Sequence, residues 1–333
     1  MQKTILKKKL FPLGDLIGAF GDVGTFVPLF SSLVLVVGLN PFPTLFCAGF
    51  LYVAAAIFFK VPIPVQPLKT MAALVIASQF PLPVVKAAGL LMGFVLILVS
   101  LTRGIEWAQF LFPPVIIKGV QFGAGLILIK TGITMFFSFT MEVPSVLRAD
   151  YFPQGEDFLK AFFALVLPQL PLTLGNSLFA TTDLSKEYYG EKAHRVSVRN
   201  LGLSLGWANI ITGFLGGFPL CHGSGGLTAH HRFGARSYKS TFFSGILFLF
   251  LAFFSLKYGI EYLKHIPTWF LGGMVIYIGI YHALLLKSLK AKKELAVLMG
   301  VLGLWSGNLA LSLLIGIFVL LMSQIYSKYF SVA

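Results

Sequence analysis

Long apolar runs, each about the length of a membrane-crossing helix, occupy most of the chain. Short clusters of proline, glycine and charged residues separate these runs, as in proteins that cross a bilayer many times. Residues 103–112 predict a helix at the membrane surface, with Trp107 at headgroup level. The apolar stretch 294–327 fits either one long tilted span or a short hairpin. The other expected long helices cover 13–38, 43–59, 84–101, 115–137, 159–182, 198–215, 240–257 and 267–286.

Two apolar regions, 61–80 and 216–232, are interrupted where the chain should be at membrane depth. In the first, prolines at positions 62, 64 and 67 forbid a continuing helix and hold the backbone extended until a short helix begins near Leu68. The second is rich in glycine around Pro219. Interrupted segments at corresponding places in two halves indicate the binding site of a transporter. Alignment on Pro64 and Pro219 equates Gln66 with Cys221, Pro67 with His222 and Lys69 with Ser224.

The composition indicates a multi-span membrane protein. Of the 333 residues, 57% are hydrophobic and 11% are charged, against about 25% charged in soluble domains. The net charge of +14 does not indicate a nucleic-acid partner, because the basic residues lie between spans, where they orient the protein. We therefore expect the lipid bilayer, and no nucleic acid, as the partner of this chain.

The sequence lacks the motifs of an enzyme or a metal protein. The two cysteines, Cys47 and Cys221, show no disulfide or zinc spacing. Ser224 lies among glycines, but His222 occupies the position of the first glycine of a nucleophile elbow. We expect no enzymatic activity, no cofactor and no bound metal.

The distribution of lysine and arginine predicts how the chain is threaded. With a cytoplasmic N-terminus, cytoplasmic segments hold 17 of these residues and outside segments hold 5. This layout needs five crossings before a polar linker, so the second half enters as an inverted repeat. We expect a multi-pass protein of the cell membrane. Its parts are a first repeat (1–138), an extracytoplasmic linker (139–158), a second repeat (159–293) and a C-terminal segment or hairpin (294–333).

The two interruptions create the conditions for an anion site. Each short-helix N-terminus presents about +0.5 charge, so two of them with the Lys69 ammonium supply about +2, which balances a dianion. Glycines let backbone N–H groups approach an oxyanion closely. The alternative is that Lys69 extends to the membrane surface. The expected substrate-binding residues are Thr25, Gln66, Lys69, Thr70, Asn176, His222, Gly223, Ser224, Gly225 and Gly226.

Asp22 is an acidic residue in the middle of the first expected span, where such a residue is costly and functional by default. Ionised, it would leave the anion complex one charge short, whereas protonation restores neutrality and is favoured by burial. We expect Asp22 to couple protons to anion transport. The alternative is a structural pairing of Asp22 with Lys69 or with a helix end. His230 and His231 are assigned to a basic loop, 230–239.

Four motifs resemble those of the molybdate transporter family within the sulfate permease superfamily. Where the family often has Leu and Met, this chain has Val23 and Leu68. The motifs are Gly21-Asp22-Val23-Gly24-Thr25, Pro62-Ile-Pro-Val-Gln66-Pro67-Leu68-Lys69, Pro168-Gln-Leu-Pro-Leu-Thr-Leu-Gly-Asn176-Ser177 and Pro219-Leu-Cys221-His222-Gly-Ser-Gly-Gly226-Leu, followed by Phe233-Gly-Ala-Arg236.

The resemblance implies an all-α polytopic protein with a uracil-permease-like fold and about 10–12 membrane segments. Two discontinuous half-helices would meet N-terminus to N-terminus at mid-membrane, each preceded by a short strand. The helices at 115–137 and 267–286 and the C-terminal segment would form a gate, with a homodimer contact as a further expectation. The implied function is molybdate uptake by alternating access, with tungstate as a competitor. The alternatives are a sulfate or other oxyanion transporter, or an anion channel.

Overall fold

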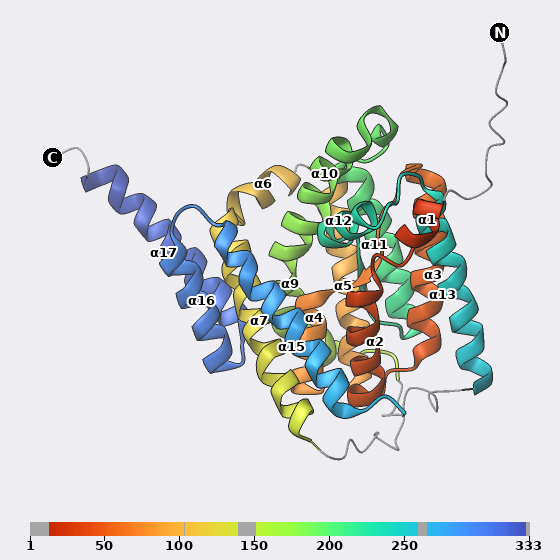
Figure 1. Ribbon diagram of the computed structural model, residues 1–333. Helices are drawn as coiled ribbons and strands as arrows, with labels where there is room; N and C mark the ends of the chain where they lie inside the picture. The colour runs from red at the N-terminus through yellow and green to blue at the C-terminus, as the bar shows by residue number, and fades with distance from the viewer. Residues whose placement is uncertain (1–12, 103, 139–150, 259–264, 331–333) are drawn as a thin grey trace, which may run out of the picture.

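The computed structural model describes residues 13–102, 104–138, 151–258 and 265–330 (Figure 1). The predicted N-terminal tail and residues 139–150 of the predicted linker lie outside these ranges. In the first half the elements are α1 (Leu13–Gly18), α2 (Val23–Val37), α3 (Pro41–Phe59), β1 (Gln66–Pro67), α4 (Lys69–Ser78), α5 (Leu82–Leu101), α6 (Gly104–Leu111) and α7 (Pro114–Phe137). The second half begins with α8 (Gly155–Ala161), η1 (Phe162–Val166), α9 (Leu167–Leu172), η2 (Thr173–Ala180), α10 (Thr181–Tyr189), η3 (Gly190–Ala193), α11 (Val198–Leu215), β2 (Leu220–Cys221) and α12 (Ser224–Arg232). It ends with α13 (Lys239–Tyr258), α15 (Thr268–Leu284), η4 (Leu285–Ser288), α16 (Lys293–Ser306) and α17 (Leu309–Phe330).

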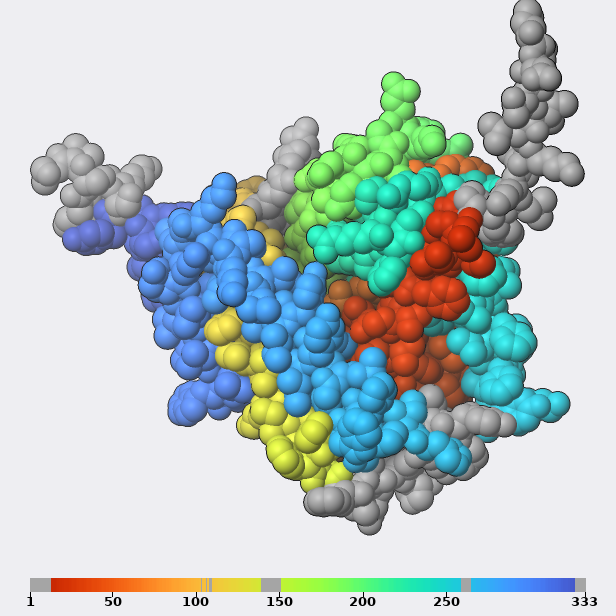
Figure 2. Space-filling view, in the orientation of Figure 1, coloured from red at the N-terminus to blue at the C-terminus, as the bar shows by residue number. Residues whose placement is uncertain are grey.

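The helices form two packed groups. The first, termed the α7 bundle, consists of α7 with α15, α16 and α17, which all pack against it. The second, termed the α12 bundle, includes α12, α4, η2, the pair α3 and α13, and the pair α5 and α11. Figures 1 and 2 show the α7 bundle (yellow and blue) on the left and the α12 bundle on the right. Within the described residues, eight helical segments are long and apolar enough to cross a membrane.

A short buried strand precedes each half-helix, as predicted, and the two strands pair with each other. β1 pairs with β2 in antiparallel orientation, with Gln66 opposite Cys221 and Pro67 opposite Leu220. Helix α4 begins at Lys69 and α12 begins at Ser224, which are the two positions that the sequence alignment equates. The fold expectation of two half-helices, each preceded by a strand, is therefore confirmed.

Buried side chains satisfy the backbone around the second strand. Asn209 accepts a hydrogen bond from the Leu220 N–H at 2.7 Å and donates one to the Leu220 carbonyl at 3.0 Å. The Phe218 N–H donates to Thr44 Oγ1 at 2.9 Å. Irregular backbone at membrane depth is tolerated only where its polar groups find such partners. These contacts explain how the interrupted segment is held between α3 and α11.

The predicted first helix, 13–38, is interrupted. Residues 19–22 form a turn between α1 and α2, and Asp22 is the N-cap residue of α2, although its side chain makes no capping bond. A Cβ on Gly21 would lie 2.6 Å from the backbone nitrogen of His230. The close approach of α12 therefore requires glycine at position 21.

The helix predicted at 159–182 is longer and less regular than expected. Helical structure begins at Gly155, within the predicted linker, and α10 and η3 extend it to Ala193, beyond the predicted end at residue 182. Two π-helical stretches, η1 and η2, flank α9, which contains Pro168 and Pro171. Proline removes helical hydrogen bonds, and π turns are a common local adjustment, often at functional sites.

The structure corrects the predicted end of the second short helix and decides between the two alternatives for the C-terminal stretch. His230 belongs to α12 and is fully buried, so its assignment to a basic loop is wrong. The C-terminal stretch forms a pair of helices, because α16 ends at Ser306, its C-cap residue Gly307 is left-handed (φ 65°), and α17 packs back against it. The surface helix near Trp107 is present as α6, and its tryptophan is exposed.

Candidate functional site

A cavity of about 360 Å³ lies between the two bundles, where α4 and α12 begin. Of the predicted substrate-binding residues, the structure brings Lys69, Asn176, Ser224 and Gly225 together on its wall. We term it the central cavity. Its other lining residues are Pro114, Ile117, Lys118, Gln121, Gly175, Ala180, Thr228, Arg232, Tyr281, His282 and Leu285.

Lys69 is the first residue of α4, and its side chain is only 9% exposed. Within the described part of the chain, its ammonium group has no hydrogen-bond or ion-pair partner. Its Nζ lies 3.7 Å from the position that a Cβ on Gly223 would take and 4.0 Å from that on Gly225. The glycines therefore leave room beside a buried, unpaired cation, which is the opposite of extension to the membrane surface.

The first turns of the two half-helices leave backbone donors free. The Met71 N–H donates to Gln169 Oε1 at 2.9 Å, and the Gly226 N–H donates to the Gly223 carbonyl at 3.0 Å. In the first turns of α4 and α12, the N–H groups of Lys69, Thr70, Ser224 and Gly225 have no partner among the described residues. Unpaired amides at helix N-termini bind anions through their N–H groups and the helix dipole.

Asn176 reaches the cavity from the π-helical stretch η2. Its side-chain oxygen accepts a hydrogen bond from the Ser224 hydroxyl, and its carbonyl accepts one from Thr181 Oγ1 at 3.0 Å. Thr181 Oγ1 also lies 2.7 Å from the His222 carbonyl. These contacts fix the wall that η2 presents to the start of α12.

The remaining predicted residues lie behind the wall or away from it. Gln66, Thr70, Gly223 and Gly226 are buried next to the first turns of the half-helices, and Thr70 Oγ1 has no partner among the described residues. The residues that do not reach the cavity at all are Thr25 and His222.

His222 acts as a link between segments. One ring nitrogen, Nδ1, contacts the Pro64 carbonyl at 2.8 Å, and the other, Nε2, contacts Ser204 Oγ at 3.0 Å. Both nitrogens are therefore used inside the protein. Thr25 lies one helical turn after Asp22 on α2 and is half-buried.

Asp22 is 2% exposed and holds three partners. Tyr52 and His230 donate to Oδ2, with His230 Nε2 at 2.9 Å, and the Gln66 amide donates to Oδ1. The ion-pair partner of Asp22 is His230 and not Lys69, and Asp22 itself lies at the N-terminal end of α2. His230 Nδ1 also contacts the Gly18 carbonyl at 2.6 Å. An imidazolium satisfies this arrangement, in which both ring nitrogens face oxygen.

Sequence reasoning missed His230, although a signal existed. Gly226 packs against the Asp22 carboxylate, and His230 follows it by one helical turn on the same face of α12. A histidine at this spacing from a glycine that faces a buried acid is a natural partner for that acid.

The wall supplied by the α7 bundle was also missed. Lys118 lines the central cavity and donates to Gln121 Oε1 at 3.3 Å. His282 lines the same wall, is 3% exposed, and has a buried Nδ1 with no partner among the described residues. These residues add polar groups that face Lys69 across the cavity.

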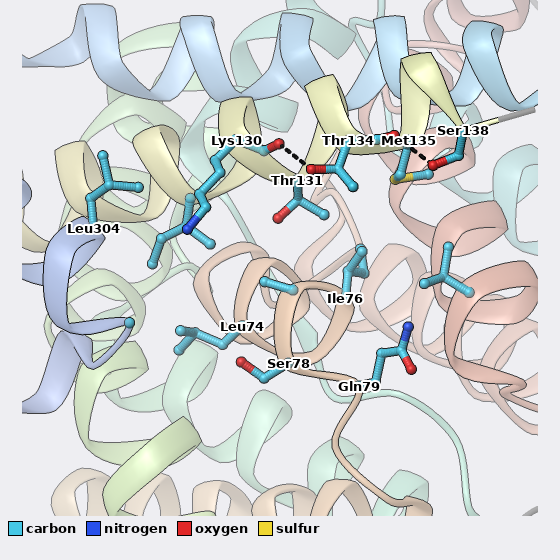
Figure 3. A pocket seen from close by; sticks show the side chains of 14 residues that line it. Leu74, Ile76, Ser78, Gln79, Lys130, Thr131, Thr134, Met135, Ser138 and Leu304 are labelled. Atoms are coloured by element: carbon cyan, nitrogen blue, oxygen red, sulfur yellow. Dashed lines mark hydrogen bonds between the residues drawn. The ribbon is translucent and has the colours of Figure 1, made fainter.

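A second cavity, of about 460 Å³, lies at the opposite end of α4, and we term it the distal cavity. Figure 3 shows Thr131 and Thr134 of α7 on one side of it and Ile76 and Ser78 of α4 on the other. Between the two cavities α4 packs against α7, and α4 residues such as Met71 are fully buried. The central and distal cavities are thus separated by packed side chains.

Most of the chain matches one family of known proteins. The model of a family described as "Molybdate transporter of MFS superfamily" matches residues 14–128 and 161–281, which are more than half of the chain and include both interruptions. The chain belongs to this molybdate transporter family. It is therefore a multi-pass membrane transporter and not an enzyme, as predicted.

Relatives and solved structures agree with this assignment. Molybdate transporter 2 of Arabidopsis thaliana is 24% identical, with 84% of this chain and 80% of that protein covered, and Molybdate transporter 1 of the same plant is 22% identical, with 86% and 82% covered. The transmembrane domain of the cyanobacterial bicarbonate transporter BicA superposes with a TM-score of 0.63 at 14% identity, covering 92% of this chain and 96% of that one. The murine anion transporter Slc26a9 in its inward-facing state gives 0.60 at 15% identity, covering 97% and 70%. These structures show the sulfate-permease-like fold that the motifs implied.

Proposed function

We propose that the protein carries molybdate across the cell membrane, with the dianion held in the central cavity. The observation that supports this most directly is the Lys69 ammonium, which is buried and unpaired among the described residues at the start of α4. A buried cation without a partner is costly, and an anion in the adjoining cavity removes that cost. The substrate class follows from the site, and the choice of molybdate follows from the family.

The charges around the cavity balance a dianion. The N-termini of α4 and α12 contribute about +0.5 each and Lys69 contributes a full charge, for a sum of about +2. Lys118 and Arg232 also line the cavity, and cations that line a cleft raise the local concentration of anions. A neutral substrate would leave this charge uncompensated.

Hydrogen bonds to the oxyanion come from both bundles. The α12 bundle offers the free N–H groups of Ser224 and Gly225 and the Asn176 side chain, with Gln66, Thr70, Gly223 and Gly226 directly behind. The α7 bundle offers His282 and Tyr281, whose hydroxyl lies 4.0 Å from the Cβ position of Gly225. The bound anion thus touches both bundles, so movement of one against the other changes its surroundings.

Alternating access fits the two cavities. Each lies between α4 and α7, one at either end of α4, with packed side chains between them. We propose that the α12 bundle moves against the α7 bundle to open one cavity at a time. The packed segment favours this carrier over an anion channel, which needs a continuous path.

Coupling to protons is assigned to the Asp22–His230 pair. The sequence analysis considered the charge of Asp22 alone. In the structure, His230 Nε2 lies 2.9 Å from Asp22 Oδ2, so the two side chains are treated as one protonatable pair. We propose that one proton binds at this pair together with molybdate and adds one positive charge beside the site. The 17-to-5 distribution of lysine and arginine supports a cytoplasmic N-terminus.

Uptake into proteoliposomes tests this function. Purified protein should give saturable molybdate uptake that tungstate inhibits, that an inward proton gradient increases, and that unlabelled molybdate preloaded inside the vesicles accelerates. Sulfate uptake without molybdate uptake would overturn the substrate assignment and leave the anion site in place. Uptake without saturation or counterflow would indicate a channel.

A further inference from the structure

One oxygen of the Asp22 carboxylate, Oδ2, already accepts two hydrogen bonds and cannot readily take a further donor. Oδ2 accepts from Tyr52 and from His230, whereas, among the described residues, Oδ1 accepts only from the Gln66 side-chain amide. A proton that binds Asp22 therefore goes to Oδ1. There it meets the Gln66 NH₂ group, which is itself a donor, and two donors cannot share a hydrogen bond.

The other end of the Gln66 amide faces the anion site. Its Oε1 is buried and has no hydrogen-bond partner among the described residues. This oxygen lies 3.0 Å from the Cβ position of Gly223, a point that is also 3.7 Å from Lys69 Nζ and 3.8 Å from Asn176 Nδ2. The side chain thus extends from Asp22 to the edge of the central cavity and presents an acceptor where an oxyanion needs donors.

We infer that Gln66 is a relay that turns its amide over when Asp22 is protonated. A proton from solvent adds to Oδ1, and the new O–H donates to Gln66 Oε1. The same rotation moves the NH₂ group toward the cavity, where it donates to the oxyanion. No covalent bond of the protein breaks. This inference rests on the proposed coupling through Asp22 and says how the proton and the anion sense each other.

The groups around Asp22 permit this rotation. Tyr52 from α3 and His230 from α12 both bind Oδ2, which remains an acceptor in either protonation state. Lys69 from α4 acts on Asp22 only at longer range, through its charge. The Gln66 amide is therefore the only one of these groups that must change its donor and acceptor roles.

The relay removes an unfavourable contact and supplies a favourable one. With Asp22 ionised, the buried Oε1 has no partner and would face the anion as one acceptor faces another. With Asp22 protonated, both ends of the amide are paired. Proton and anion therefore bind with positive coupling, and each raises the affinity for the other.

Equilibrium binding of molybdate to the purified full chain at several pH values tests the relay. For the wild type we expect affinity to fall as pH rises, by up to about tenfold per pH unit for one coupled proton. Asp22→Asn carries a permanent donor toward Gln66 and should bind tightly with no pH dependence. Gln66→Met, of similar length but without the amide, should bind weakly and lose most of the pH dependence.

A matched control is Gln121→Met, which removes a buried amide from the opposite wall of the cavity. Its molybdate affinity should change with pH as steeply as that of the wild type, whatever the affinity itself is. We call this dependence of affinity on pH the pH slope. If Gln66→Met fails to fold by size-exclusion chromatography, Gln66→Asn replaces it, because its shorter amide cannot reach both Asp22 and the cavity.

The outcomes separate the relay from the proposed coupling. A Gln66→Met protein with the full wild-type pH slope would show that Asp22 acts through charge alone and would overturn the relay. A wild-type slope in Asp22→Asn would overturn the proposed coupling itself and place the proton elsewhere. Loss of the slope in both variants, with Gln121→Met unchanged in slope, supports the relay.

Discussion

Gln66 lies directly opposite Cys221 in the two-stranded ladder, and the same two residues correspond when the two interruptions are aligned. The half-helices α4 and α12 each begin three residues later, at Lys69 and Ser224. A local two-fold relation therefore passes through this pair and directs both helix N-termini to one place. The relation is broken where it matters chemically, because one helix begins with a cation and the other with a hydroxyl.

Replacement of Lys69 by Gln should weaken molybdate binding severely. The variant keeps a hydrogen-bond donor but removes a full charge from a buried site, which costs about 2 kcal/mol or more, or roughly 30-fold in affinity. Molybdate binding and uptake by Lys69→Gln measure this loss. The control is Lys257→Gln, at an exposed position near the end of α13, which should behave as the wild type. Equal affinities of Lys69→Gln and the wild type would refute the site.

His282 should contribute to binding from the α7 bundle. His282→Phe keeps an aromatic ring but removes the ring nitrogens that face the cavity region, and the loss of a buried hydrogen bond should raise KM for molybdate by about 5- to 30-fold. The exposed His194, replaced in the same way, serves as the control. A KM that does not change would remove the α7 bundle from the substrate site.

Gly21→Ala should destabilise the protein, whereas Gly24→Ala should not. A Cβ at position 21 would lie 2.6 Å from the backbone nitrogen of His230, and such overpacking costs about 1–3 kcal/mol. A Cβ at position 24 meets no described atom within 4 Å, and alanine favours the helix there. Thermal unfolding of the two variants in detergent compares them. Equal melting temperatures would contradict the close packing of the turn before α2 on α12.

Cysteine labelling should reveal alternating access. Thr131→Cys in the distal cavity and Thr228→Cys in the central cavity are placed in a chain whose two buried cysteines are replaced by alanine. Impermeant thiol reagents should reach the two positions from opposite sides of the membrane. Saturating molybdate should change the two labelling rates in opposite directions, because only one cavity is open at a time. Rates that rise or fall together would favour a channel.

Much of the fold is readable from local rules. Prolines 62, 64 and 67 cannot continue a helix whatever surrounds them, so the start of α4 at Lys69 follows from the covalent structure of the chain. The run 198–215 between polar and glycine-rich flanks predicts α11 without error. The π-helical stretches around α9 were not predictable, because apolar periodicity does not distinguish a π turn from an α turn.

The sequence by itself determined where the chain is interrupted, that Lys69 begins a half-helix, and that Asp22 is an unusual acid at membrane depth. Each of these depends on a residue and its close neighbours. Only the tertiary structure decided that Asp22 pairs with His230, a residue 208 positions away, and that α7 and α15 complete the cavity. Such contacts depend on how separate helices pack, and many packings satisfy the same apolar pattern. The chemistry of single positions is therefore local, whereas the pairing of those positions is a property of the folded whole.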